Sequence, residues 1–434
     1  MTLDRRQFLV RSGLLGASGV SAGLAGAGGA AAATGGPEAA GGARGTDPLQ
    51  ADGPLQLSGV ADPAARLPAV AFHGAHQAGI LGPPPPAACF AACDVTVSGR
   101  AALAQLLQTI TATARFLTAG GRPPAVAAGA PSPDSGTLGP VVPADGLTVT
   151  LGVGTPLFDG RFGLAARRPA GLFAMRAFPN DRLDPAQCGG DLMLSICAGS
   201  ADTAIHALRQ IARATRGHMH LRWRIDGFVS PGRPAGVPRN HQGFRDGIAN
   251  PDVRRATVAQ RLLWLAGGAG DQAWTAGGTY HVCRVIRMFT ERWDGLPVAG
   301  QERIVGRRRD SGAPLGDRAE TDIPDYAADP HGRVIPLNAH IRLANPRTRA
   351  AEHSRILRRS FNYDRGLAPD GSLDMGLIFN CYQRDVRRQF EAVQKRLRHE
   401  PMAPFIRPFG GGYFFTLPGV RDASDWLGSG LLAA

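Results

Sequence analysis

The sequence contains few aromatic residues and almost no lysine. Aromatic residues make up 6% of the 434 residues, and Lys395 is the only lysine, so arginine carries nearly all the positive charge behind the formal net charge of +13. Arginine runs such as residues 307–309 can attract anions. No motif that reads DNA or RNA accompanies them. The composition therefore argues against a nucleic-acid partner and favours a solvated basic surface.

The sequence also lacks the residue spacings of protein metal sites. None of its six cysteines forms a CxxC pair, and its 11 histidines show neither HxxxH nor HExxH spacing. We therefore expect no metal site built from cysteines or from several histidines. Cys188 and Cys197 are a candidate disulfide, whereas Cys283 and Cys381 lie in apolar runs, where buried free thiols are common.

The N-terminal segment is not apolar enough for a membrane span, but its charge pattern predicts an export signal. Arg5 and Arg6 form a twin-arginine motif, a Gly- and Ala-rich stretch follows, and small residues run to Ala33. We expect residues 1–33 to be a twin-arginine signal peptide and residues 34–66 to be a Gly-, Ala- and Pro-rich linker. A disordered tail with a chance arginine pair is the alternative. The signal predicts a periplasmic, cell-envelope or extracellular protein, and this route favours proteins that fold around a cofactor before export.

Apolar periodicity predicts two halves with the same order of elements. In the first half we expect strands at residues 87–97, 147–153, 191–198 and 218–225, and helices at residues 101–117 and 201–216. The second of these helices should turn Ile205, Leu208 and Ile211 inward. In the second half we expect strands at residues 279–289, 335–343, 374–383 and 412–417, and helices at residues 291–305 and 384–397.

Both halves have the order β-α-β-β-α-β, which is the ferredoxin-like order. We therefore predict an α+β fold of two ferredoxin-like units with antiparallel sheets, one at residues 67–226 and one at residues 227–430. A ligand pocket beside or between the two units would be typical of such a fold.

Three residues could carry chemistry, and each also has an ordinary explanation. Asp246 lies in a glycine-bracketed loop, residues 243–251, where it is either a turn residue or an acid that approaches a ligand. His340 lies in an apolar run, where it is either a core histidine or an iron ligand. Arg358 and Arg359 are surface charges unless one of them meets an acid in a pocket.

Several segments resemble the dye-decolorising peroxidase family. The motif Gly243-x-x-Asp246-Gly247 resembles its signature, and further similar segments lie at residues 77–80, 157–163, 178–181, 324–327, 340–347, 373–377 and 410–415. The resemblance covers roughly residues 70–430. It extends to the exported subgroup described as deferrochelatase/peroxidase, which accompanies a ferrous iron uptake permease.

The resemblance implies one haem b per chain, in a pocket that lies mainly in the C-terminal half. It implies that His340 is the proximal iron ligand, Asp246 the distal acid and Arg358 the distal arginine, with Arg359 as the alternative if the register is shifted by one residue. The residues implied to contact haem are Gly247, Ile248, Ala249, Asn345, Pro346 and Arg347, together with His340 and Arg358. A histidine that binds a metal usually donates its other ring N–H to an acid, and for His340 we predict that this acid is Asp385.

The same resemblance implies a haem peroxidase that uses hydrogen peroxide to oxidise dye-like, phenolic or porphyrin donors. Release of iron from haem with the porphyrin intact is a second activity to consider. The alternative is a haem-binding or iron-handling protein of the cell envelope without significant turnover. The partners that we consider are iron-uptake permease components, the twin-arginine translocase during export, and a second copy of this chain in a homodimer.

Overall fold

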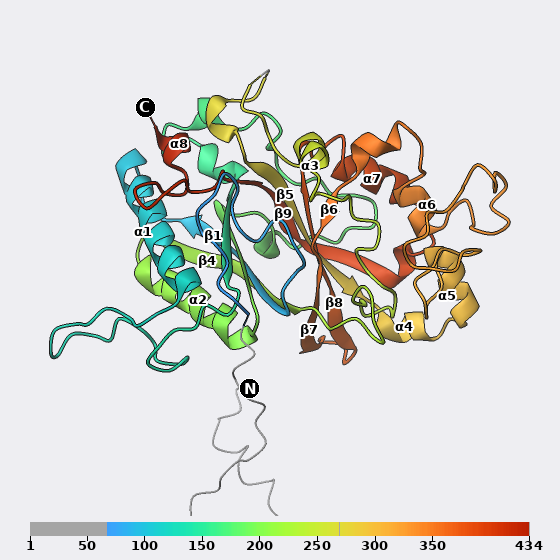
Figure 1. The fold of residues 1–434 in the computed structure, drawn as a ribbon, viewed down its shortest axis with the longest axis horizontal. Helices are drawn as coiled ribbons and strands as arrows, with labels where there is room; N and C mark the ends of the chain where they lie inside the picture. The colour runs from blue at the N-terminus through green and yellow to red at the C-terminus, as the bar shows by residue number, and fades with distance from the viewer. Residues whose placement is uncertain (1–66, 269, 434) are drawn as a thin grey trace, which may run out of the picture. The chain divides into compact units, whose positions relative to one another are not determined.

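The chain of this computed structural model repeats one order of strands and helices twice within the described residues, 67–268 and 270–433. The first unit contains β1 (Ala87–Val95), α1 (Arg100–Ala119), β2 (Thr148–Gly154), β3 (Leu192–Ala198), α2 (Ala201–Ala214) and β4 (Met219–Phe228). The second unit contains β5 (Thr279–Met288), α4 (Thr290–Asp294), α5 (Val298–Val305), α6 (His340–Ala344), β6 (Leu357–Arg358), β7 (Phe361–Leu367), β8 (Leu373–Gln383), α7 (Phe390–Leu397) and β9 (Ile406–Thr416). Figure 1 shows the two units side by side, and the predicted duplicated α+β fold is confirmed.

Two short helices lie outside the repeated order: α3 (Ala256–Leu262) between the units and α8 (Ser429–Leu432) near the C-terminus. Within the described ranges, none of the helices combines the length and apolarity that a membrane crossing requires. The predicted signal peptide, residues 1–33, and linker, residues 34–66, lie outside the described residues.

The strands of the two units join into one closed ring. The first unit has the strand order β4-β1-β3-β2 and the second has β7-β8-β5-β9, with all neighbours antiparallel. The edges of the two units then meet: β2 pairs with β9, for example Gly152 with Thr416, and β4 pairs with β7 at Phe228 and Asn362. Both units therefore contribute to one continuous sheet whose inner face is enclosed.

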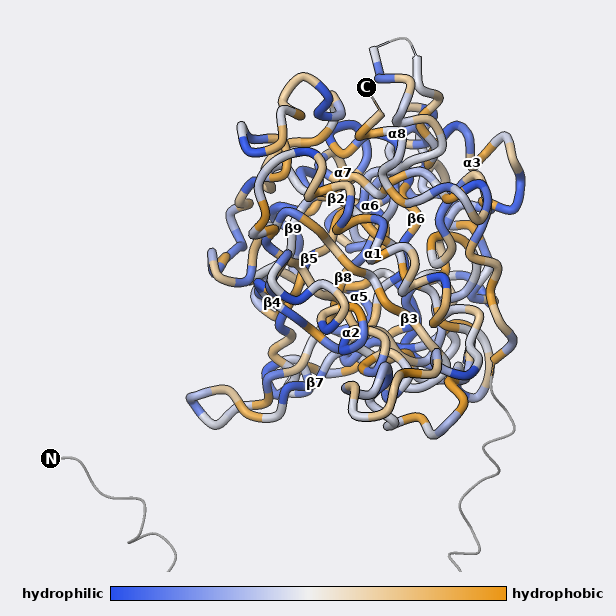
Figure 2. The backbone as a smooth tube through the Cα atoms, turned by 90° about the vertical axis from the view of Figure 1, so that its left-hand side faces the viewer, coloured by the Kyte–Doolittle hydropathy of each residue, from blue (hydrophilic) through white to orange (hydrophobic). Residues whose placement is uncertain are grey.

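Most of the strands are buried on both faces and are correspondingly apolar, whereas β4 is an exception because His220, Arg222 and Arg224 are exposed. Strand β3, coloured mostly as hydrophobic in Figure 2, is buried at all seven positions. Inside the ring, aromatic side chains from both units form one cluster that includes Phe90, Trp223, Phe361 and Phe414. This shared cluster fixes the two units against each other.

The outer face of the first sheet is covered by α1 and α2. In α1 the apolar residues recur at helical spacing, and Leu103, Leu107 and Ile110 are fully buried against the sheet. The buried face of α2 is centred on Ala204, Ala207, Leu208 and Ile211. Ile205 lies about 100° round the helix from Ala204, so it faces solvent at 44% exposure, and the predicted inward orientation is wrong for this residue.

Three of the predicted elements in the second half differ from the structure. Residues 335–343, predicted as a strand, form a turn followed by α6: the Ala339 backbone N–H donates to the Pro336 carbonyl at 3.0 Å and closes the turn, which buries Ile335 and Ala339. Strand β7 takes the expected place in the order. The predicted helix 291–305 is split into α4 and α5 at Pro297, and the predicted helix 384–397 begins only at Phe390.

The predicted disulfide between Cys188 and Cys197 is wrong, since all six cysteines are free thiols. Cys188 precedes β3, whereas Cys197 lies near the end of this extended strand. A seven-residue strand spans roughly 20 Å, far beyond the reach of roughly 7 Å between the Cα atoms of a disulfide.

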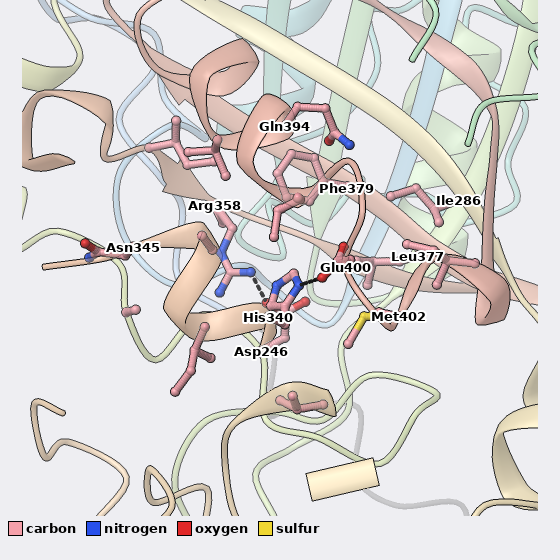
Figure 3. Close-up of a pocket in the computed structure, with 18 of the residues that line it drawn as sticks. Asp246, Ile286, His340, Asn345, Arg358, Leu377, Phe379, Gln394, Glu400 and Met402 are labelled. Carbon is pink, nitrogen blue, oxygen red and sulfur yellow. Dashed lines mark hydrogen bonds and ion pairs between the residues drawn. The ribbon is translucent and has the colours of Figure 1, made fainter. Parts of the chain in front are cut away.

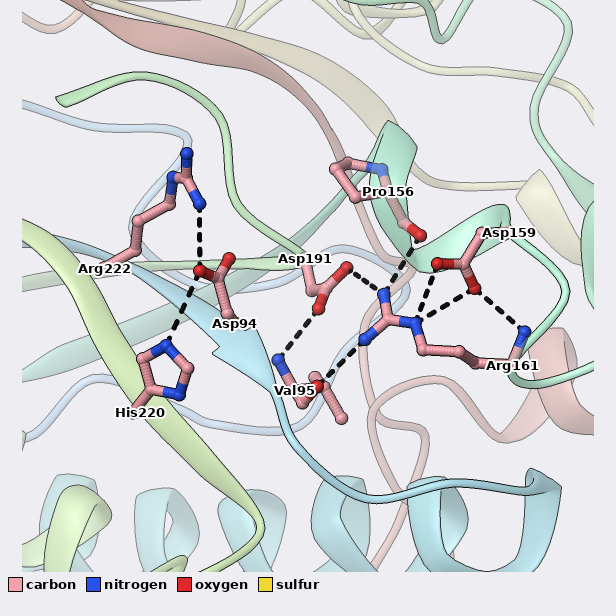
Figure 4. Close-up of polar contacts among 8 residues, drawn as sticks. All are labelled: Asp94, Val95, Pro156, Asp159, Arg161, Asp191, His220 and Arg222. Carbon is pink, nitrogen blue, oxygen red and sulfur yellow. Dashed lines mark hydrogen bonds and ion pairs between the residues drawn. The ribbon is translucent and has the colours of Figure 1, made fainter. Parts of the chain in front are cut away.

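A polar network centred on Arg161 holds the residues that precede β3 (Figure 4). It gives the family-like segment 157–163 a structural role. Arg161 of the segment 157–163 pairs through Nη2 with Asp191 Oδ1 at 2.7 Å and through Nε with Asp159 Oδ2 at 2.7 Å. Its Nη1 donates to the Val95 carbonyl at 2.9 Å. The network joins the ends of three segments at one edge of the first unit.

Candidate active site

A cavity of about 250 Å³ lies against the outer face of the second sheet, beneath α6 and α7. Its apolar wall includes Ile286, Leu377, Phe379 and Met402 (Figure 3). Most of its lining comes from the second unit, and the first unit contributes residues 178–180. Asp246, His340 and Arg358 all line this cavity, so the structure brings together the three residues that the sequence singled out.

The loop that carries Asp246 is held as a narrow hairpin. The Asp246 backbone N–H donates to the Pro238 carbonyl at 2.9 Å, and the Arg239 guanidinium donates to the Gly243 carbonyl at 2.9 Å. Gly247 follows with φ of 101°, a conformation that favours glycine. The Asp246 side chain is 16% exposed and points into the cavity.

Arg358, not Arg359, faces Asp246. Arg358 Nη1 lies 3.1 Å from Asp246 Oδ1, and its side chain is 26% exposed. Arg359 is buried on the other side of the strand, where its Nη1 donates to the Gly82 carbonyl and its backbone N–H donates to Asn380. Because side chains alternate across a strand, only one of the two neighbouring arginines can enter the cavity. Of the two arginines, Arg358 is therefore the one that faces the cavity and Asp246.

His340 is the first residue of α6, and Glu400 holds its ring. His340 Nδ1 lies 2.6 Å from Glu400 Oε2, a buried carboxylate, so Nε2 is the ring nitrogen left to meet a ligand. Burial by itself lowers the pKa of His340, but the charge and hydrogen bond of Glu400 outweigh it, so its pKa lies above the ordinary value.

Asp385 is not the partner of His340, and that prediction is wrong. Its carboxylate instead accepts the backbone N–H groups of Arg387 and Arg388, in the turn that precedes α7. Glu400 was missed because it lies 60 residues from His340, outside every motif. No spacing in the sequence signals a contact that only the fold creates.

The other residues predicted to contact a cofactor divide into two groups. Ile248, Ala249, Asn345 and Arg347 line the cavity together with His340 and Arg358. Gly247 and Pro346 are not among its lining residues, and they shape the two loops that carry their neighbours. Arg347 adopts a φ of 57°, and its backbone N–H donates to Asn345 Oδ1 at 3.1 Å, which turns the loop at the cavity.

Several residues of the cavity lining carry a buried hydrogen-bond donor that has no partner among the described residues. Six such atoms belong to lining residues: Gln242 Nε2, Arg245 Nε, Arg284 Nη1, Tyr326 Oη, Arg347 Nε and Arg355 Nε. Burial of a donor without an acceptor is costly. The cavity therefore suits a ligand that has an apolar body and carries acceptors such as carboxylates.

A closed pair of ferredoxin-like units, with an acid–arginine pair and a carboxylate-bound histidine in one cavity, has the features of a haem-dependent peroxidase. The chain belongs to the Dyp-type peroxidase family: the model of the family's N-terminal part matches residues 77–229, and that of its C-terminal part matches residues 237–421.

Individual relatives agree with this assignment. A deferrochelatase of Escherichia coli is 48% identical over 383 residues, which cover 86% of this chain and 90% of the relative. The crystal structure of a DyP-type peroxidase from Cellulomonas bogoriensis is 38% identical with a TM-score of 0.75, covering 84% of this chain and 98% of that chain. Ferric DtpA from Streptomyces lividans is 35% identical with a TM-score of 0.75, covering 84% and 97%.

Proposed function

We propose that this protein is a haem b peroxidase that uses hydrogen peroxide to oxidise dye-like, phenolic or porphyrin donors. The observation that carries the proposal is the Asp246–Arg358 pair, at 3.1 Å, in the same cavity as His340. A protein that merely carries haem needs neither an acid nor an arginine there. The pair therefore speaks against the alternative of a haem-binding protein without turnover.

The cavity fits haem on three counts. Its apolar wall suits the porphyrin body, and its unpartnered donors, Arg347 Nε and Tyr326 Oη among them, suit the two carboxylates. His340 Nε2 would bind the iron, with Glu400 fixing the ring orientation and raising its basicity. Bound haem supplies the redox chemistry that reduces peroxide and accepts electrons from donors.

The protein's own residues handle the proton and the charge. Asp246 accepts a proton from one oxygen of hydrogen peroxide and returns it to the other, a general acid–base contribution of roughly 10²–10⁴-fold. Arg358 presents a fixed positive charge to the oxygen that becomes negative as the O–O bond breaks. The pairing of Arg358 with Asp246 keeps both groups aimed at the same space.

Release of iron from haem, with the porphyrin intact, is the second candidate function. It is supported by the name of the E. coli relative, a deferrochelatase, which is 48% identical to this chain. In this activity haem is the substrate, and the products are free iron and protoporphyrin. The two activities use the same cavity and differ in their products, which are an oxidised donor in the first case and free iron with protoporphyrin in the second.

One preparation tests both activities. Purified protein loaded with haem should oxidise a phenolic dye only when hydrogen peroxide is present, and the visible spectrum should change when peroxide is added alone. Incubation with excess haem should yield free protoporphyrin, measured by its fluorescence, if the second activity operates. If the protein neither oxidised the dye in the presence of peroxide nor changed its spectrum when peroxide was added, the peroxidase proposal would be overturned.

Export by the twin-arginine route to the periplasm or cell envelope is part of the proposal. It is supported by Arg5 and Arg6 and by the Gly- and Ala-rich stretch that follows them. We also propose three partners: the twin-arginine translocase, an iron-uptake permease and a second copy of the chain. Replacement of both arginines by lysine should retain the protein inside the cell, which fractionation would show.

A further inference from the structure

Asn250 makes two hydrogen bonds to the backbone of a single residue that lies 108 residues away in the sequence. Its side-chain Nδ2 donates to the Arg358 carbonyl at 2.8 Å, and its Oδ1 accepts the Arg358 backbone N–H at 2.9 Å. Asn250 does not line the cavity. Its contacts therefore reach the backbone of the distal arginine without reaching any ligand.

Strand β6 explains why this pairing is needed. It is only two residues long and ends the order of strands, with β8 as its neighbour on one side. The backbone N–H of the next residue, Arg359, turns toward β8 and bonds to Asn380. The N–H and C=O of Arg358 face the opposite way, where the amide of Asn250 replaces a neighbouring strand.

The same residue also belongs to the loop of the distal acid. Asn250 follows Asp246 by four residues, and its backbone N–H closes a turn onto the Gly247 carbonyl at 3.1 Å. A longer contact joins Arg355 Nη2 to the Ala249 carbonyl at 3.5 Å. The hairpin is also tied to β7, where Asn362 Nδ2 donates to the Arg239 carbonyl at 2.9 Å. Among the described residues, however, Asn250 is the residue of the Asp246 loop that bonds to the backbone of Arg358 itself.

We propose that Asn250 is a positioning residue for the reaction with peroxide, holding the backbone of Arg358 in register with Asp246. This inference rests on the proposed peroxidase function. The ion pair must yield when peroxide enters between the two side chains, whereas the pairing of Asn250 with the Arg358 backbone can persist. Asn250 therefore preserves the alignment at the moment when the two groups act on peroxide and not on each other.

The chain offers a matched control in Gln77. Its side-chain amide also pairs in both directions, donating to the Leu151 carbonyl at 2.8 Å and accepting the Leu151 backbone N–H at 2.8 Å. It lies at the junction of β2 with the C-terminal segment, far from the cavity lining. Gln77→Ala thus removes the same kind of bond pair, together with a third bond from Nε2 to the Leu417 carbonyl at 2.8 Å, without touching the reacting residues.

The test uses the full chain loaded with haem and compares wild type, N250A, N250D and Q77A. The rate of the spectral change after one addition of peroxide should fall about tenfold or more in N250A, with the Soret absorbance per protein unchanged. N250D keeps an acceptor for the Arg358 N–H but loses the donor to its carbonyl, so it too should be slow, and it serves if N250A folds poorly. Q77A should lower the thermal midpoint but keep the peroxide rate within about twofold.

A double-mutant cycle separates positioning from general damage. In an R358L background, N250A should change the peroxide rate by less than about twofold, because its effect acts through Arg358. A wild-type rate in N250A and N250D, or an undiminished effect in the R358L background, would overturn the inference. A wild-type protein that binds no haem or ignores peroxide would instead overturn the proposed function, so the two failures are distinct.

Discussion

The two units share one strand order but use the outer face of their sheets differently. In the first unit, α1 and α2 press leucine and isoleucine side chains directly onto the sheet, and Leu107 is fully buried there. In the second unit the helix equivalent to α2 is the shorter α7, and α4 and α5 replace a single long helix. A cavity occupies the space that apolar side chains fill in the first unit. This scaffold therefore gains a site where one of its two copies lacks part of the apolar packing.

Substitution of the cavity histidine, His340, should have the largest effect, because it should abolish haem loading, whereas substitution of a buried histidine in the first unit should not. His340→Ala removes the ring nitrogen that would hold the iron, so haem loading should fall to near zero, measured by Soret absorbance per protein. Full stoichiometric loading with an unchanged Soret band would remove His340 as the ligand. His206, a buried histidine of the first unit, provides the control, since His206→Gln should leave haem loading intact.

Substitution of the cavity acid should separate chemistry from binding. Asp246→Asn keeps the shape of the side chain but removes its capacity to accept a proton, so the peroxide reaction should slow by roughly 10²–10⁴-fold. Haem loading should remain at the wild-type level, because Asp246 does not hold the iron. Stopped-flow absorbance measures the rate, and full activity in this variant would refute the acid–base role.

A Leu→Ala substitution in α2 should cost more stability than the same substitution in α7, its counterpart in the second unit. Leu208 of α2 is 3% exposed, so Leu208→Ala should lower the free energy of unfolding by roughly 2–5 kcal/mol and leave the peroxide rate unchanged. Leu397 of α7 lines the cavity, so Leu397→Ala creates less new void in the protein without haem and should cost less. Denaturant unfolding measures both. Equal losses in the two variants would contradict the claim that the second face is incompletely packed.

Acid should destabilise the fold through a histidine of the second sheet. Burial lowers the pKa of His281 to about 4; its ring stacks on Tyr382, and its Nε2 bonds to the neutral amide oxygen of Asn380 at 2.8 Å. Below the ordinary pKa of about 6.5 the unfolded chain binds this proton and the folded chain does not, so stability falls as the pH drops from about 6.5 toward 4. Between pH 7 and pH 5 the loss should be about 2 kcal/mol. Unfolding curves of His281→Gln, which stays neutral, should lack this part of the acid slope.

The sequence predicts the fold well where periodicity is strong and less well where loops build the site. The leucine spacing of residues 101–117 and the apolar runs of β5 and β8 give the duplicated order directly. Residues 335–343 are equally apolar, but Pro336 and tertiary burial make them a turn and a helix. Local propensity alone could not decide that segment.

The candidate site was predictable to the extent that motifs mark it. Asp246 and His340 lie in such motifs, and the cavity contains both. Glu400 and Asn250 act through contacts 60 and 108 residues apart in sequence, which depend on the ring of strands and not on local pattern. Arg358 and Arg359 could not be told apart from the sequence, because their side chains point to opposite faces of the chain and only the fold shows which face borders the cavity.

The pairing of β2 with β9 has a consequence for synthesis on the ribosome. Gly152 cannot pair with Thr416 until the ribosome has added the 264 residues from position 152 to position 416, so the ring cannot close before β9 has emerged. The last residue of the cavity lining, Pro408, lies in the same final strand. Until then the β2 border of the first unit lacks its partner strand, and an unpaired strand edge favours association with other chains. The complete cavity lining is accordingly available only after β9 has been synthesised.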